Sequence, residues 1–150
     1  MKKILILFSI SLLICNSDIL AQKQHPVLNH IAIYVHNLKT STDFYHNIIQ
    51  LDTIPEPFHD GKHTWFSIGG NSHLHLIQGA ENVTSHDKNG HICFTIASVP
   101  DFILNLNKAG IPYEDWKGNP QSITLRVDGV KQIYFKDPDG FWVEINDALK

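Results

Sequence analysis

Histidine is unusually frequent in this sequence, with ten copies in 150 residues, and several copies lie where they could do chemistry. His30 and His91 each open a run of alternating aliphatic residues, which is typical of a β-strand. The run His73–Ile77 carries further histidines, and Glu144 lies inside another apolar run. Imidazole and carboxylate groups together bind first-row metal ions, which polarise carbonyl or hydroxyl groups. The pattern therefore predicts a metal site, if the fold gathers these side chains.

Alternation within the runs predicts which side chains share a face, because successive side chains of a strand point to opposite sides. In the opening run Ile31, Ile33 and Val35 share the aliphatic face, which should pack on a helix, as should Ile123, Leu125 and Val127 further on. A buried carboxylate without a partner costs several kcal/mol, so Glu144 is a poor core residue. The concave face should therefore carry the polar set: His30, His73, His75, His91, Arg126, Tyr134 and Glu144.

These residues suggest roles. Three imidazoles and one carboxylate suit one divalent Zn, Ni, Fe, Co or Mn ion better than Ca or Mg. Glu144 and Tyr134 are the candidate catalytic residues, with Glu144 serving as ligand and proton acceptor by turns. Arg126 either holds an anionic substrate group or is a surface residue. Trp65 either binds substrate in a groove, with Trp116 and Trp142, or belongs to the core.

Cys93 and the remaining histidines are not among the candidate site residues. Cys93 lies on the pocket face and is interpreted as a small buried residue rather than a nucleophile. The remaining histidines are expected in loops or on a helix, in contact with solvent: His25, His36, His46, His59, His63 and His86.

An internal repeat must position these residues. His30–Val35 reappears 61 residues later as His91–Ile96, and helical patterns follow at Ser41–Gln50 and from Pro100 to Gly110. The sequence thus predicts an α+β fold of two βαβββ modules, 27–79 and 90–147, forming a cup-shaped mixed sheet with helices outside. Strand-like runs follow near 53–58, 63–68 and 73–77, then 112–116, 122–127, 132–135 and 141–145, so either 112–116 or 122–127 should be irregular.

The N-terminus resembles a targeting segment. Lys2 and Lys3 precede the apolar run Ile4–Ile14, and Ala21 is a suitable residue before a cleavage site, so residues 1–21 are predicted to be a signal peptide. The mature chain 22–150 would be exported, to the periplasm or the extracellular space. Lipidation at Cys15 is the alternative, and only then would the chain be anchored to a membrane.

Charge and cysteine content argue against a nucleic-acid-binding protein and against a fold stabilised by disulfides. The chain carries 12 Lys and Arg against 15 Asp and Glu, and no basic cluster follows Lys3, which argues against nucleic-acid binding. After cleavage Cys93 is the remaining cysteine, so no disulfide can form within the mature chain.

Four motifs resemble the vicinal oxygen chelate superfamily, which includes glyoxalase I, extradiol dioxygenases and the fosfomycin and bleomycin resistance proteins. Leu28–Val35 resembles its opening strand and Phe44-Tyr45 its helix signature. Gly90-His91-Ile92 resembles the start of its second module, and Asp137–Glu144 its closing hairpin. The resemblance covers nearly all of 22–150.

The resemblance implies a ligand set of His30, His75, His91 and Glu144. His75 is preferred over His73 because Leu74-His75-Leu76 resembles the family's Leu-Glu-Leu. The chain departs here from glyoxalase I, which has a carboxylate at this position. Family members often form homodimers, sometimes by exchanging modules, so a homodimer is expected.

The resemblance implies an exported, metal-dependent lyase or isomerase of the lactoylglutathione-lyase type, acting on a small metal-chelating substrate. One alternative is an extradiol-type dioxygenase with a His30, His91 and Glu144 triad. The other is a metal-free module that sequesters a small molecule, as bleomycin resistance proteins do. Export argues against glutathione or CoA as the thiol, because both are cytosolic.

Overall fold

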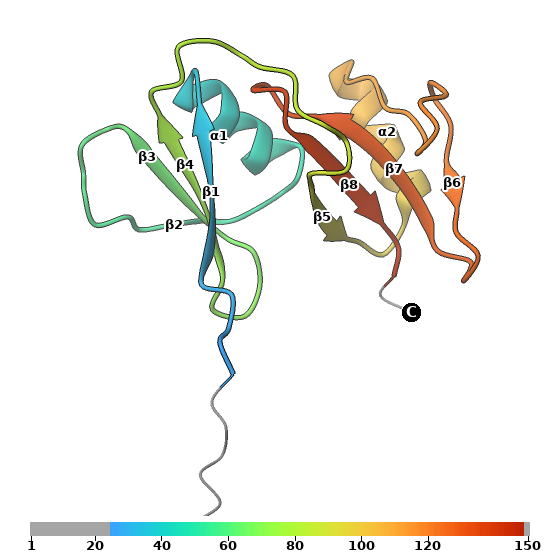
Figure 1. Cartoon of the computed structure of the whole chain (residues 1–150), viewed down its shortest axis with the longest axis horizontal. Helices are drawn as coiled ribbons and strands as arrows, with labels where there is room; N and C mark the ends of the chain where they lie inside the picture. Colours follow the sequence, from blue (N-terminus) through green and yellow to red (C-terminus); the bar gives the residue numbers. More distant parts are fainter. Residues whose placement is uncertain (1–24, 149–150) are drawn as a thin grey trace, which may run out of the picture.

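The computed structural model describes residues 25–148, so the predicted signal peptide and Cys15 lie outside the described residues. Two modules follow one another with the same order of elements, as Figure 1 shows. None of the helices within 25–148 has the length and apolar character needed to cross a bilayer. The first module contains β1 (His30–Val35), α1 (Leu38–Asn47), β2 (Thr53–Ile54), β3 (His63–Ser67) and β4 (His73–Gln78). The second contains β5 (His91–Thr95), α2 (Val99–Ala109), β6 (Thr124–Leu125), β7 (Lys131–Lys136) and β8 (Trp142–Asn146).

Each module is a four-stranded mixed sheet with one helix against it (Figure 1). The orders are β1-β4-β3-β2 and β5-β8-β7-β6, and in both sheets the first pair is parallel and the others antiparallel. The predicted α+β fold of two βαβββ modules with open, cup-like sheets is thus confirmed. The irregular run is 112–116, where Glu114 makes only isolated bridges to Pro120 and Tyr134.

The alternating strands bury the faces that the sequence predicts. Val35, Leu74 and Leu76 are fully buried in the first module, as are Ile133 and Val143 in the second. The expectation for 122–127 is wrong, however. Ile123, Leu125 and Val127 are exposed, because β6 is only two residues long and pairs with β7 alone. An edge strand this short has no helix over it to bury an aliphatic face.

Local capping signals delimit both helices. Helix α1 begins before the expected Ser41, because the Asn37 side chain accepts a hydrogen bond of 3.0 Å from the Thr40 amide. Helix α2 has Ser98 as its N-cap, and Gly110 ends it in the left-handed conformation with φ of 67°, as predicted.

The turn between β7 and β8 fastens the second module to α1. Asp139 accepts hydrogen bonds from the His36 amide (2.6 Å) and the Ser41 hydroxyl (2.5 Å). Asp137 accepts one from the Tyr45 hydroxyl at 2.8 Å. Burial raises the pKa values of both Asp137 and Tyr45. These contacts fix α1 of one module against the closing hairpin of the other.

Replacing Tyr45 by Phe is expected to lower the free energy of unfolding by about 1–3 kcal/mol, because a buried carboxylate oxygen of Asp137 loses its donor. Urea denaturation followed by circular dichroism measures the loss. Tyr34→Phe is the control, since Tyr34 is exposed and its replacement should stay within about 0.5 kcal/mol of wild type. Equal stabilities of the two variants would contradict the role of this hydrogen bond.

Candidate functional site: two half-sites for a metal ion

Three strands of the second module bring His91, Tyr134 and Glu144 together, and we call this group the second half-site. Glu144 on β8 is opposite Tyr134 on the antiparallel neighbour β7. Its Oε2 lies 3.1 Å from Nε2 of His91 and accepts a 2.7 Å hydrogen bond from the Tyr134 hydroxyl. Glu144 is only 6% exposed, so these contacts hold a buried carboxylate.

The other carboxylate oxygen of Glu144 is held separately. Oε1 accepts hydrogen bonds from the side-chain amide of Asn146 (2.9 Å) and from the Cys93 thiol (3.3 Å). Burial alone would raise the pKa of Glu144, but hydrogen bonds from Tyr134, Asn146 and Cys93 outweigh it, and the pKa lies below its usual value. Glu144 is therefore ionised at neutral pH, as a metal ligand must be.

Cys93 is not the small buried residue that the sequence suggested, since it is exposed at the concave face. Desolvation of its thiol and the nearby Glu144 carboxylate raise the pKa of Cys93 to about 12. The thiol is therefore protonated at neutral pH, which argues against a nucleophilic role.

The first module repeats this arrangement with His30, Trp65 and His75, and we call this group the first half-site. His75 on β4 is opposite Trp65 on β3, as Glu144 is opposite Tyr134. The His75 ring stacks on the Trp65 ring with centroids 3.9 Å apart and on the His30 ring at 4.4 Å. The repeat therefore places a histidine, a second candidate ligand and an aromatic residue at equivalent positions of both sheets.

The ring nitrogens of the three histidines fit metal binding. Nδ1 of His91 lies 2.8 Å from the Lys88 carbonyl, and Nδ1 of His30 lies 2.8 Å from the Asn29 side-chain oxygen. Such partners orient the ring and leave Nε2 for a metal. Nε2 of His75 is buried without a hydrogen-bond partner. Burial and the neighbouring histidines lower the pKa of His75, so its imidazole is neutral at pH 7. The donor set and this unpartnered nitrogen both suit a first-row ion.

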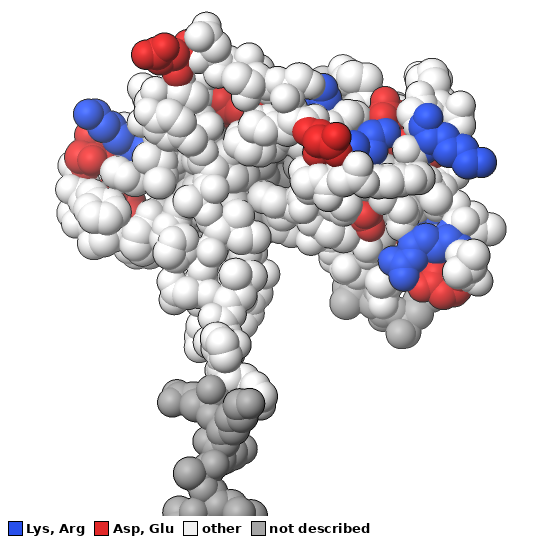
Figure 2. All heavy atoms as spheres, in the orientation of Figure 1, with Lys and Arg blue, Asp and Glu red and all other residues white. Residues whose placement is uncertain are grey.

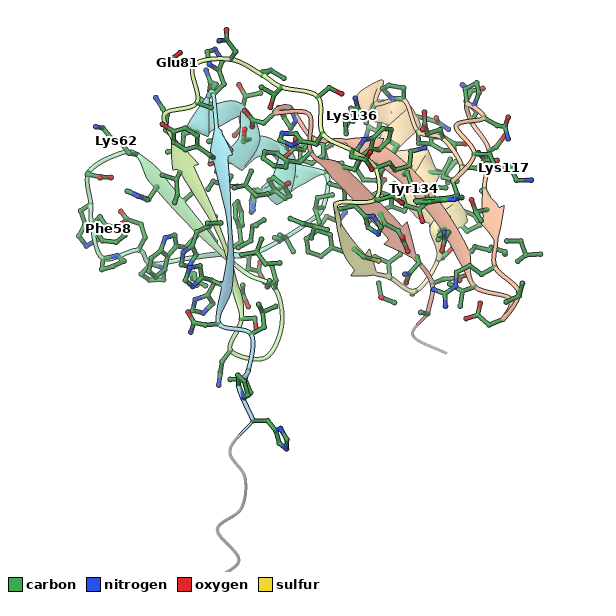
Figure 3. All side chains as sticks on the ribbon, viewed as in Figure 1. Phe58, Lys62, Glu81, Lys117, Tyr134 and Lys136 are labelled. Atoms are coloured by element: carbon green, nitrogen blue, oxygen red, sulfur yellow. The ribbon has the colours of Figure 1, made fainter. Side chains whose placement is uncertain are left out.

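The two half-sites do not meet within one chain. Between residues 25 and 148, no three His, Cys, Asp or Glu side chains are grouped closely enough to hold a metal ion. In Figure 3 the labelled Tyr134 of the second half-site lies in the second module, away from the sheet of the first. The four predicted ligands are thus brought together as two pairs, His30 with His75 and His91 with Glu144.

Arg126, Trp142 and Trp116, the remaining residues proposed from the sequence, lie outside the two half-sites. Arg126 lies in the turn after β6, half-exposed, and its guanidinium donates a 2.6 Å hydrogen bond to Asp128. Trp142 opens β8, and its Nε1 donates to the His86 carbonyl at 3.0 Å. Trp116 is exposed, with its ring 5.5 Å from the Tyr134 ring.

Two further residues, His63 and Asn146, lie beside the half-sites, and the sequence patterns did not single them out as site residues. His63 was expected to be solvated, yet it opens β3 and is only partly exposed beside the first half-site. Asn146 holds Glu144, and strand parity would have found it, because residues 144 and 146 of one strand share a face.

Known proteins resemble this chain over most of its length. The family model of the Glyoxalase/Bleomycin resistance protein/Dioxygenase superfamily matches residues 27–145. The chain is 30% identical over 128 residues to metallothiol transferase FosB of Staphylococcus epidermidis, covering 79% of this chain and 80% of that protein. It is 26% identical over 124 residues to glyoxylase I 4 of Arabidopsis thaliana, covering 79% and 68%.

Solved structures share the fold. The oxidase ChaP-H1 matches with a TM-score of 0.67 at 23% identity, covering 82% of this chain and 96% of that one. Lactoylglutathione lyase from Agrobacterium tumefaciens matches with a TM-score of 0.61 at 20% identity, covering 85% and 96%. Together with the matched family model and the relative at 30% identity, the repeated βαβββ modules establish that the chain belongs to the glyoxalase, bleomycin resistance protein and dioxygenase superfamily.

Proposed function

We propose that this protein is a metal-dependent enzyme that acts on a small molecule chelating the metal through two neighbouring oxygens. The proposed reaction is an isomerase or lyase reaction of the type catalysed by lactoylglutathione lyase. The observation that carries the proposal is the second half-site, in which His91 Nε2 and Tyr134 both contact one oxygen of an ionised, buried Glu144. An imidazole nitrogen and an ionised carboxylate oxygen on adjacent strands are donors that a first-row metal ion binds.

We further propose that two copies of the chain complete the site. Each copy contributes both half-sites, and the described residues leave His30 and His91 exposed on their sheets. When the first half-site of one copy faces the second half-site of its partner, three imidazoles and one carboxylate surround a common point. A homodimer would then hold two such sites, and His30, His75, His91 and Glu144 would be the ligands.

Glu144 and Tyr134 would have different roles in the proposed reaction. The bound metal would supply a positive charge that acidifies a C–H or O–H group of the chelating substrate. Glu144 accepts the proton, and the hydrogen bonds from Asn146 and Cys93 to Oε1 keep the carboxylate oriented for this role. Burial and the Glu144 carboxylate raise the pKa of Tyr134, which therefore stays protonated and donates a hydrogen bond to Oε2. Tyr134 thus holds the proton acceptor in place.

One observation supports a second candidate, an extradiol-type dioxygenase. His75 is sandwiched between the rings of Trp65 and His30, and these contacts on both faces give it a packing role beside the metal even where it is not a ligand. His30, His91 and Glu144 would then form the two-histidine, one-carboxylate triad that suits Fe(II). The identity of the metal separates this candidate from the isomerase.

We also propose that the enzyme works outside the cytosol, on the strength of the signal-like pattern in residues 1–21. Its substrate would then be a molecule other than a glutathione or CoA adduct, because those thiols belong to the cytosol.

Elemental mass spectrometry of the mature protein, purified without a histidine tag, tests the proposal. We expect about one first-row metal ion per chain and its loss in His91→Ala, because each metal ligand contributes strongly to affinity. His46→Ala is the matched control, since His46 lies exposed on α1 with its Nδ1 near the Leu51 carbonyl. This variant should bind as much metal as the wild type.

The metal identified decides between the candidates. Ni or Zn would favour the isomerase, and Fe or Mn would favour the dioxygenase. If no ion binds even after each is added back, the metal-dependent function is contradicted, and a sequestering module remains.

A further inference from the structure

We propose that the hollow beside the first half-site binds a flat, uncharged ring of the substrate, so that the substrate is an aromatic or similarly conjugated molecule with adjacent oxygens. This inference rests on the proposed function and names the substrate class. The hollow has a volume of about 510 Å³ and opens next to His30 and His75. Its size falls within the usual range for small-molecule sites, about 300–1,000 Å³.

Aromatic rings form most of the wall. The Trp65 ring lies 6.0 Å from the Phe58 ring in an edge-on arrangement and 6.1 Å from the His73 ring in a stacked one. The His63 ring lies 4.7 Å from Phe58. Phe58, in the loop between β2 and β3, is 58% exposed, so part of its ring is free to contact a ligand. Rings at such spacings pack against one another, and the free face or edge of such a wall suits contact with a further ring.

A polar atom in this wall lacks a partner. Trp65 occupies the position in its sheet that Tyr134 occupies in the other. The Tyr134 hydroxyl donates to Glu144, whereas Nε1 of Trp65 is buried with no acceptor. The indole of Trp142, by contrast, donates to a backbone carbonyl. A buried donor without an acceptor costs free energy that an oxygen atom on a bound ring would recover.

Charge argues against an anionic occupant. None of the residues lining the hollow is Lys or Arg. The neighbouring carboxylate of Asp60 is engaged by His63 at 2.9 Å and by the Lys62 amide. In Figure 2 basic side chains gather mainly over the second module, and the visible face of the first is largely uncharged. The wall of the hollow thus offers no Lys or Arg side chain to pair with a phosphonate or carboxylate, whereas a neutral ring needs none.

Two chelators that differ only in the ring test the inference. Acetohydroxamate and benzohydroxamate carry the same pair of neighbouring oxygens, and isothermal titration calorimetry of the metal-loaded protein gives their dissociation constants. We expect benzohydroxamate to bind about tenfold more tightly, equivalent to about 1.4 kcal/mol. In Phe58→Ala the preference should fall to about twofold with acetohydroxamate affinity little changed, because a stacking partner outside the half-site is lost. In Trp65→Leu the preference should fall as well, whatever the change in acetohydroxamate affinity.

Leu104→Ala is the control, because Leu104 is similarly exposed but lies on α2 in the other module. It should retain the full preference. Phe58→Ala keeps the test decisive if Trp65→Leu fails to fold, since Phe58 lies in an exposed loop.

The outcomes separate this inference from the proposed function. Metal binding with equal affinity for both hydroxamates overturns the ring site and leaves the metal-dependent function standing. A preference for benzohydroxamate that survives both variants also overturns it. A protein that binds neither metal nor hydroxamate overturns both proposals.

Discussion

A heterodimer that combines His30→Ala/His75→Ala in one chain with His91→Ala/Glu144→Gln in the other is expected to bind half as much metal per chain as the wild type. The first chain keeps an intact second half-site, and the second keeps an intact first half-site. If the ligands come from two copies, one of the two sites in this heterodimer has all four ligands and the other has none. Co-expression with two different tags that lack histidine, followed by tandem purification and elemental mass spectrometry, measures the metal.

The corresponding homodimers are the controls. Each double variant alone has two incomplete sites and should bind almost no metal, while its circular dichroism stays that of the wild type. A heterodimer without metal would show that the ligands are not shared between chains. Wild-type metal content in either homodimer would show that the altered pair is not part of the site.

Gly140→Ala is expected to lower the free energy of unfolding by about 3 kcal/mol or more, because it combines backbone strain with a clash. Gly140 has a φ of 87°, which L-residues rarely adopt. A Cβ atom at this position would also overlap the backbone carbonyl of Thr84, in the segment that joins the modules. Backbone atoms cannot rotate away as a side chain does, so the hairpin or the joining segment must shift.

Gly129→Ala isolates the strain from the clash. Gly129 has nearly the same φ, 84°, and a Cβ there would meet no atom within 4 Å. Its replacement should cost only about 1 kcal/mol, the strain of the left-handed conformation. Urea denaturation of both variants measures the difference between their free energies of unfolding. Equal losses of stability would show that the close contact between Gly140 and Thr84 does not limit the residue at position 140.

Local patterns in the sequence determined the strands, their faces and the equivalence of the modules. Alternation with a period of two depends on neighbouring residues alone, so it correctly separated buried Val35 and Leu76 from exposed His30 and His91. The repeat determined that His75 and Glu144 occupy equivalent strands, because the two segments form the same hydrogen-bonded pairs. Alternation wrongly predicted that Leu125 is buried, because burial of a strand's face also requires a neighbouring element to cover it.

Only the tertiary structure decided how the ligands are distributed. Asp137 and Asp139 bind Tyr45 and Ser41 of α1, and these contacts between distant segments set how one module lies on the other. In that arrangement the His30 pair and the His91 pair lie apart, which no local pattern expresses. The ring stack on His75 likewise depends on the packing of three strands. The sequence by itself therefore determined which residues are candidate ligands, and the packing of the sheets decided that one chain brings them together only in pairs.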